Sequence, residues 1–145
     1  MLPEKTREQF EKVVESQLAR IQAMKDQGDF VDYSKLDKII IGVCGGDGIG
    51  PMITSMAQHV LETLLADKVK AGKVEFRVID GLTIERRAEL GCAIPPDVME
   101  ELKACHVILK GPTTTPRKGD PWPNVESANV AMRKALDLFA NVRPV

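Results

Sequence analysis

The residues best suited to bind an anionic ligand lie in the last third of the chain, from Lys110 to Arg143. The segments 110–116, 127–133 and 140–144 contain a lysine, hydroxyl and amide side chains and two arginines. All of these groups can hydrogen-bond carboxylate or hydroxyl oxygens, and each guanidinium can bind a carboxylate through two parallel bonds. The sequence therefore favours an acidic small molecule as the ligand.

The elements that must position these residues begin with a helix expected over 127–140, where apolar residues partly follow a 3.6-residue period. Ser127 and Asn129 lie near its N-terminus, where free backbone N–H groups and the helix dipole favour anions. Arg133 lies about two turns further along. The alternative is that these basic residues belong to a solvated helix face, as surface arginines often do.

The chain resembles the β-decarboxylating dehydrogenases, the isocitrate/isopropylmalate dehydrogenase family, in four motifs. These are Gly46-Asp-Gly-Ile-Gly-Pro51, Lys110-Gly-Pro-Thr-Thr-Thr-Pro116, Ser127-x-Asn-x-x-x-Arg133 and Asp137-Leu-Phe-Ala-Asn-Val-Arg-Pro144. Their order and spacing extend from Ile39 to the end of the chain and are most similar to the N-terminal part of an isocitrate dehydrogenase. Each motif alone is weak, but the combination is specific.

The resemblance implies roles for individual residues. Positions that bind the carboxylates and hydroxyl of isocitrate in the family match Ser127, Asn129, Arg133 and Arg143, and a lysine at the edge of the same pocket matches Lys110. The resemblance also implies that Thr114 and Thr115 lie near the nicotinamide and that Ile49 lies beside the adenosine part of the cofactor. Ser127 together with Asn129 favours isocitrate as the substrate, and isopropylmalate, homoisocitrate and tartrate are the alternatives.

Two features depart from the family pattern. The link of ten residues, 117–126, between the threonines and Ser127 is longer than the usual glycine-rich one, and Met52 replaces an acid that commonly follows the first loop. The tyrosine and lysine that act as acid and base, and the aspartates that bind the metal, have no counterpart in this chain. The resemblance thus implies no catalytic and no metal-binding residue here.

The implied function is that of an N-terminal portion or subunit of an NAD(P)-dependent isocitrate dehydrogenase, which decarboxylates isocitrate oxidatively to 2-oxoglutarate in the tricarboxylic acid cycle. The implied cofactors are NAD or NADP and Mg²⁺ or Mn²⁺, with metal ligands outside the chain. The implied partners are a C-terminal portion or second subunit, in an oligomer, and the chain alone is expected to be inactive. A non-catalytic regulatory subunit is the alternative.

Composition excludes several other classes. The 145 residues are 43% hydrophobic with a net charge of −1, which predicts one folded domain and disfavours nucleic acid or a membrane surface as partner. No apolar run approaches the length of a membrane span, and the N-terminus lacks the apolar core of a signal peptide. The expected compartment is the cytoplasm. Three cysteines at scattered spacings favour reduced thiols.

The rest of the chain predicts an α/β fold, the N-terminal part of a dehydrogenase large domain with a helical extension. A helix over 3–27 has an apolar stripe, and it is either a docking helix for another subunit or an extension folded against its own domain. The expected division is 1–37 for extension and linker and 38–145 for the α/β portion. Strands are expected at 38–44, 74–79 and 105–109, and helices from Pro51, over 83–90 and over 95–104.

The glycine loop 45–50 invites comparison with the dinucleotide-binding fingerprint G-x-G-x-x-G. The match fails because Pro51 occupies the position of the third glycine. We therefore do not expect a self-sufficient pyrophosphate site, and the family resemblance implies that the loop instead turns tightly beside the adenosine part of the cofactor.

Overall fold

The computed structural model describes residues 3–27 and 31–144, which form two compact units that divide after Lys35. In the first unit, helix α1 (Glu4–Gln27) confirms the helix predicted there, and a short 3-10 turn, η1, covers Tyr33–Lys35. Gly28 and Asp29, which follow the predicted helix, lie outside the described residues. The apolar side chains of α1 are exposed within this unit, namely Phe10, Val13, Val14, Leu18, Ile21 and Met24. None of the described helices is long and apolar enough to cross a bilayer.

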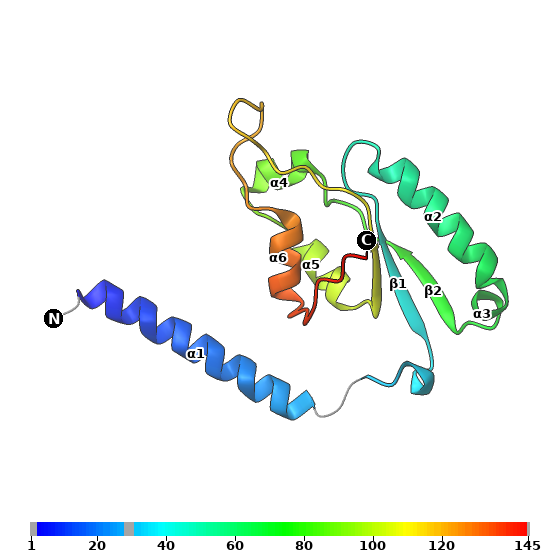
Figure 1. Cartoon of the computed structure of the whole chain (residues 1–145), viewed down its shortest axis with the longest axis horizontal. Helices are drawn as coiled ribbons and strands as arrows, with labels where there is room; N and C mark the ends of the chain where they lie inside the picture. The colour runs from blue at the N-terminus through cyan, green and yellow to red at the C-terminus, as the bar shows by residue number, and fades with distance from the viewer. Residues whose placement is uncertain (1–2, 28–30, 145) are drawn as a thin grey trace. The chain divides into compact units, whose positions relative to one another are not determined.

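The second unit is built on a parallel sheet of three strands in its described residues, in the order β2-β1-β3 (Figure 1). Strand β1 (Ile39–Cys44) lies between β2 (Val74–Val78) and β3 (Val107–Lys110). Its β-branched residues are half-buried to fully buried, as expected of a strand inside a parallel sheet. Ile41 of β1 is paired with both Phe76 and Val107, so one strand fixes the register of the other two.

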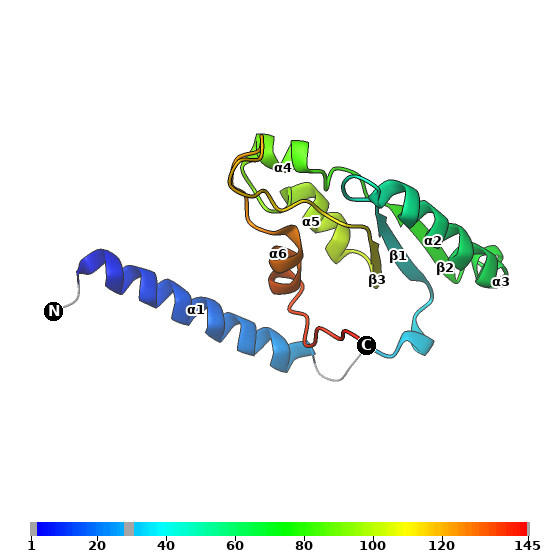
Figure 2. The same cartoon turned by 45° about the horizontal axis from the view of Figure 1, so that its top comes forward.

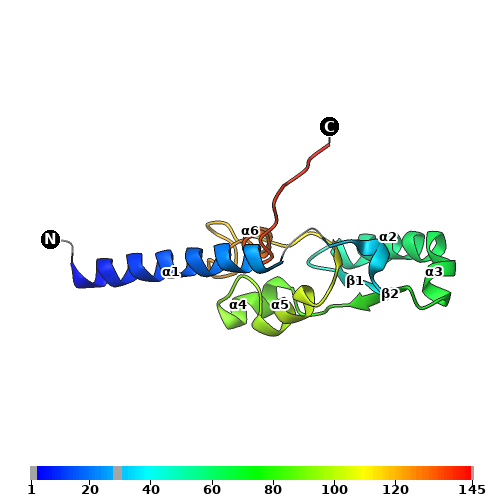
Figure 3. The ribbon, with the colours of Figure 1, turned by 90° about the horizontal axis from the view of Figure 1, so that it is seen from below.

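The connections between strands cover opposite faces of the sheet. Helices α2 (Gly50–Leu64) and α3 (Ala66–Lys70) lead from β1 to β2, and α4 (Ile84–Leu90) and α5 (Pro96–Lys103) lead from β2 back across β1 to β3. Right-handed crossovers that run in opposite directions place their helices on opposite faces. Figures 1 to 3 accordingly show α2 on one side of the strands and α5 on the other. This arrangement confirms the predicted α/β class.

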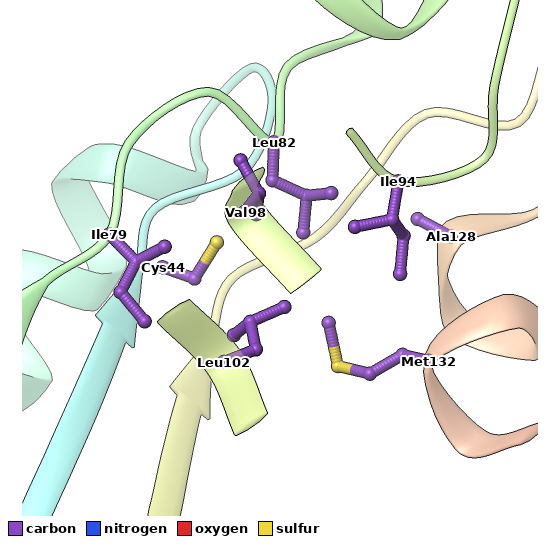
Figure 4. Packing of buried hydrophobic residues seen from close by; sticks show 8 residues of the cluster. All are labelled: Cys44, Ile79, Leu82, Ile94, Val98, Leu102, Ala128 and Met132. Atoms are coloured by element: carbon purple, nitrogen blue, oxygen red, sulfur yellow. The ribbon is translucent and has the colours of Figure 1, made fainter. Parts of the chain in front are cut away.

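The hydrophobic core lies between the carboxyl end of the sheet, α5 and α6 (Ala128–Ala135), as Figure 4 shows. Val98 and Leu102, one turn apart on α5, are fully buried between Cys44 of β1 and Met132 of α6. Removing a side chain such as that of Leu102 would cost about 2–5 kcal/mol. The core therefore fixes the start of α6 beside the ends of the strands.

The helix predicted over 127–140 is too long, because α6 ends at Ala135. Leu136 caps the helix, and Asp137 adopts a positive φ of 47°, a left-handed conformation that cannot continue it. Beyond this point the apolar side chains have no core to pack against, since Leu138 and Phe139 are exposed. Residues 136–144, hereafter the C-terminal segment, therefore leave the helix.

Candidate substrate-binding site

The sheet has a topological switch point between β1 and β3, and the surface outside the carboxyl ends of these two strands is here called the crevice, after the usual ligand site of such sheets. The chain leaves β1 toward α2 on one face, and it reaches β3 from α5 on the opposite face. Ligands of open α/β sheets bind at such a switch point, outside the carboxyl ends of the strands. The glycine loop 45–50 follows β1 there and the loop 110–116 begins at the end of β3, so the fold brings the first two motifs together.

The glycines allow the two loops to touch through their backbones. A side chain on Gly46, which has a φ of 73°, would collide with the carbonyl oxygen of Pro112, and one on Gly111 would collide with that of Gly45. The Asp47 N–H donates to the Pro112 carbonyl oxygen at 2.8 Å. The loop therefore turns tightly against the backbone of 111–112 at Gly46.

Lys110, the last residue of β3, is bound by residues of its own loop. Its ammonium group donates to the Gly111 carbonyl oxygen at 2.8 Å and to the Thr113 hydroxyl at 3.0 Å. Burial lowers the pKa of Lys110, and the positive charge of Arg87 lowers it further, whereas Cys44 and Asp47 oppose the shift. An anionic ligand would relieve this unfavourable environment for the charged lysine.

Asp47 binds the loop 110–116 from the other side. One carboxylate oxygen accepts the Thr114 N–H at 2.6 Å, and the other accepts the Ile84 N–H, at the start of α4, at 2.7 Å. Bonds of this kind to a charged acceptor are the stronger class of hydrogen bond. One side chain therefore joins the glycine loop, the threonine loop and α4.

Arg87 completes the framework from within α4. Its side chain is fully buried, with 0% exposure, and it donates from three nitrogens to three carbonyl oxygens. These are Ala93 at 2.7 Å, Thr114 at 2.8 Å and Glu126 at 2.9 Å. Burial lowers the pKa of Arg87, and the negative charge of Asp47 acts in the opposite direction. The guanidinium thus joins the threonine loop directly to the residue that precedes Ser127.

Helix α6 presents the third motif. Ser127 occupies its N-cap position, is half-buried, and makes no side-chain capping bond, so the hydroxyl is not used to satisfy the helix's own N–H groups. Asn129 is exposed in the first turn. Arg133 donates from Nε to the Asn129 carbonyl oxygen at 3.1 Å, which keeps its side chain along the helix.

The structure links some of the predicted site residues and not others. Arg87 binds both Thr114 and Glu126, the residue before Ser127, and Asp47 also binds Thr114, whereas Lys110 is bound within its own loop and Thr115 is exposed. Ile49 follows the glycine loop and is 66% exposed at the start of α2. Arg143 is exposed on the C-terminal segment, beyond the end of α6.

Sequence reasoning missed the two residues that organise the site. Asp47 was considered only as part of the glycine loop, whose flanking residues Gly46 and Gly48 both have positive φ in the structure. Arg87 was expected only to lie within the helix over 83–90. Its neighbour Arg86 pairs with Asp97 at the surface, and no sequence pattern distinguishes the two arginines.

The described residues do not form a complete site for the divalent cation and the dinucleotide that the family resemblance implies. Among residues 3–27 and 31–144, no group of three or more His, Cys, Asp or Glu side chains could hold a metal ion. The glycine loop is packed against backbone, as described above. Any divalent cation or dinucleotide would thus need further residues beyond those described here.

Fold and crevice together define an α/β protein whose candidate ligand site lies at the switch point of a parallel sheet. A sequence profile of the family described as isocitrate/isopropylmalate dehydrogenase matches residues 40–145, and the chain belongs to this family. The structure is similar to the crystal structure of a β-decarboxylating dehydrogenase from Thermococcus kodakarensis in its apo form. That match has a TM-score of 0.53 and 33% identity, covering 68% of this chain and 27% of the other.

Similar sequences belong to both branches of the family. The chain is 42% identical over 110 residues to an isocitrate dehydrogenase [NADP] of Archaeoglobus fulgidus and 39% identical over 112 residues to that of Caldococcus noboribetus. Each match covers 75% of this chain but only 25% and 24% of the relative. A 3-isopropylmalate dehydrogenase of Anaeromyxobacter dehalogenans is 36% identical over 107 residues, or 72% of this chain and 30% of that protein. The chain thus spans a quarter to a third of the length of these relatives.

Proposed function

We propose that this chain is the substrate-binding portion of an NAD(P)-dependent isocitrate dehydrogenase, which converts isocitrate to 2-oxoglutarate by oxidative decarboxylation. The observation that supports this most is the joint attachment of Thr114 and Glu126 to Arg87, which brings the threonine loop and the N-terminus of α6 to one crevice. The identity of 39–42% to isocitrate dehydrogenases supports the same substrate. Isocitrate has three carboxylates and a hydroxyl, which suit a crevice containing a cation, hydroxyls and helix N–H groups.

In this proposal the chain's own residues bind the substrate and orient it. Lys110, Ser127 and Asn129 contact carboxylate and hydroxyl oxygens, and Arg133 and Arg143 bind carboxylates through paired N–H bonds. Thr114 and Thr115 lie near the nicotinamide, and Ile49 lies beside the adenosine. NAD or NADP would accept a hydride, and Mg²⁺ or Mn²⁺ would polarise the carbonyl. Orientation alone leaves most of the barrier in place, so the acid, the base and the metal ligands come from another polypeptide segment.

An exposed apolar face on α2 is evidence that a partner segment packs against it. Its large side chains are between 44% and 75% exposed and recur at helical spacing, namely Ile49, Met52, Ile53, Met56, Val60 and Leu64. A contiguous apolar surface of this kind marks an interaction site. The occupant we propose is the C-terminal portion of the dehydrogenase, since the relatives are about three to four times longer than the matched segment. Because Ile49 ends this face, the occupant would also border the crevice.

Two other proposals concern the setting of the chain. Residues 38–145 form the large-domain portion, and residues 1–37 form an extension whose exposed apolar stripe on α1 suits another subunit of an oligomer. We place the assembled enzyme in the cytoplasm.

A second substrate class is supported by one comparison. The 36% identity to a 3-isopropylmalate dehydrogenase is close to that of the isocitrate enzymes, so isopropylmalate, homoisocitrate or tartrate are the alternatives. A non-catalytic regulatory subunit, which keeps the anion crevice without the catalytic groups, is a further alternative.

The test is complementation. The purified chain is mixed with the C-terminal portion of an isocitrate dehydrogenase, and reduction of NAD and of NADP is followed with each of the four acids and Mg²⁺. We expect no turnover by either part alone and isocitrate-dependent turnover by the mixture. Turnover with isopropylmalate instead would move the chain to the other branch. Turnover by the chain alone would contradict the proposed division of labour, and assembly without turnover with any of the four acids would favour a regulatory role.

A further inference from the structure

Arg87 occupies an unusual position for a charged residue. It is fully buried, and its guanidinium donates to carbonyl oxygens from three separate segments, the Ala93 turn, the threonine loop and the end of the link 117–126. Buried charges are costly unless they are paired or fully hydrogen-bonded. Its bonds to carbonyl oxygens and the nearby charge of Asp47 offset part of this cost.

Two of these bonds define the geometry of the crevice. Nη1 binds Thr114 and Nη2 binds Glu126, and both nitrogens belong to one rigid, planar group. The carbonyl oxygens of Thr114 and Glu126 are therefore held at a separation set by the guanidinium. Asp47 fixes the N–H of Thr114 at the same time, so both backbone polar groups of this residue are bound to charged side chains.

Most of the link between these two positions is exposed, although Trp122 is half-buried, Val125 is buried, and the Glu126 carboxylate pairs with Lys134 of α6 at 3.0 Å. Residues 117–120 form a turn in which Asp120 accepts the Arg117 N–H at 2.7 Å, and Arg117 to Asp120 are all exposed. The length of the link is one of the two features by which the sequence departs from the family pattern. Because Arg87 closes the loop at its base, extra residues in the link can bulge outward without displacing Ser127.

We propose that Arg87 is a positioning residue that holds the threonine loop and the N-terminus of α6 at one fixed separation, independent of the length of the link 117–126. Thr114 and Ser127 then meet the same ligand. This inference rests on the proposed function only for the identity of that ligand, which we take to be isocitrate.

The first test lengthens the link without touching Arg87. Inserting Gly-Ser-Gly-Ser after Gly119, an exposed position with a φ of 100°, should change the dissociation constant of isocitrate by less than about threefold, since loop entropy rises slowly with length. Calorimetric titration of the full chain measures it. A tenfold or greater loss of affinity would show that the link, and not Arg87, sets the position of Ser127, and would overturn the proposal.

The second test removes the guanidinium. Arg87→Met should weaken isocitrate binding more than tenfold, and Arg87→Lys should restore only part of the loss, because one ammonium cannot bind three divergent carbonyl oxygens at once. Arg86→Met is the matched control, since Arg86 pairs with Asp97 at the surface and should bind normally. If Arg87→Met stays folded and binds isocitrate as the unmodified chain does, the proposal is wrong.

Amide hydrogen exchange separates this inference from the proposed function. In Arg87→Lys without ligand, the amides of Thr114 and of residues 128–131 should exchange about tenfold faster, while those of β1 keep their protection. If the unmodified chain binds no isocitrate but shows this local pattern, the proposed function fails and the positioning role stands. If exchange rises equally in β1, Arg87 stabilises the whole fold and the positioning role is refuted.

Discussion

The loop 110–116 and the C-terminal segment 136–144 both contain residues predicted to bind the substrate, yet the chain holds them very differently. In the loop, the backbone N–H and carbonyl of Thr114 are bound by Asp47 and Arg87, and Lys110 is bound by two further acceptors. In the C-terminal segment, Leu138, Phe139 and Arg143 are exposed. The chain therefore preorganises one part of its site and leaves the other to contacts that its own core does not make.

The largest expected effect comes from adding a negative charge to the preorganised part. Ser127→Glu places a carboxylate where the substrate's own carboxylate should lie, and like charges in a partly desolvated crevice cost several kcal/mol. Activity of the assembled enzyme should fall more than about 100-fold. Ala135→Glu, at the exposed other end of α6, adds the same charge and should leave kinetics within about threefold. Near-normal kinetics of the Ser127 variant would show that the crevice is not the substrate site.

Variants of Arg133 on α6 and Arg143 on the C-terminal segment allow the two regions to be compared directly. Arg133→Ala and Arg143→Ala should each raise KM for isocitrate about 10- to 150-fold, because a charge-assisted bond contributes roughly 1.5–3 kcal/mol. The KM for the cofactor should change much less, and the lysine variants should recover only part of the loss. For Arg143 we expect the effect only after assembly, as its segment is exposed in this chain. A melting curve excludes unfolding as the cause, and a folded variant with unchanged KM would assign that arginine to the solvated surface.

The pH dependence of binding should report on Lys110. A bound carboxylate favours the charged lysine, so affinity is greatest below the pKa that Lys110 has in the free chain and falls as pH rises through it. Burial lowers that pKa, so the decline should begin below the range in which an exposed lysine titrates. Calorimetric titration across alkaline pH should show a severalfold loss of affinity. Lys110→Met should remove this dependence, whereas Lys103→Met, on the exposed face of α5, should retain it.

The smallest effect concerns the C-terminal segment in the free chain. Phe139 is fully exposed, so Phe139→Ser should change the free energy of unfolding by less than about 0.5 kcal/mol. If this segment packs against a partner portion, the same variant should weaken assembly measurably. A large loss of stability in the free chain would show that the segment is already packed and would remove the contrast between the two regions.

Much of the fold could be predicted from sequence because its determinants are local. The buried β-branched run at Ile39–Cys44, the proline at the start of α2 and Gly91, which caps α4 with a φ of 61°, each specify an element on their own. The end of α6 could not be predicted this way. Leu138 and Phe139 continue the apolar pattern, yet the helix stops at Ala135, Asp137 adopts a positive φ, and both apolar side chains are exposed without a core partner.

The site residues that could be predicted and those that could not differ in the same way. The hydroxyl, amide and basic residues were found because their types match a carboxylate ligand and their spacing matches a family. Asp47 and Arg87 act through backbone groups of residues far away in sequence, at separations of 67 positions for Asp47 to Thr114 and 39 for Arg87 to Glu126. Such bonds depend on topology, which the sequence pattern around each residue does not encode.

The central claim is that the threonine loop and the N-terminus of α6 form a single carboxylate site. Titrating isocitrate into the ¹⁵N-labelled chain and following its amide resonances tests this claim directly. We predict that Thr113 to Thr115 and residues 128–130 shift together, with one saturable dissociation constant. Shifts confined to one of the two segments, or unsaturable shifts spread over exposed lysines, would contradict it.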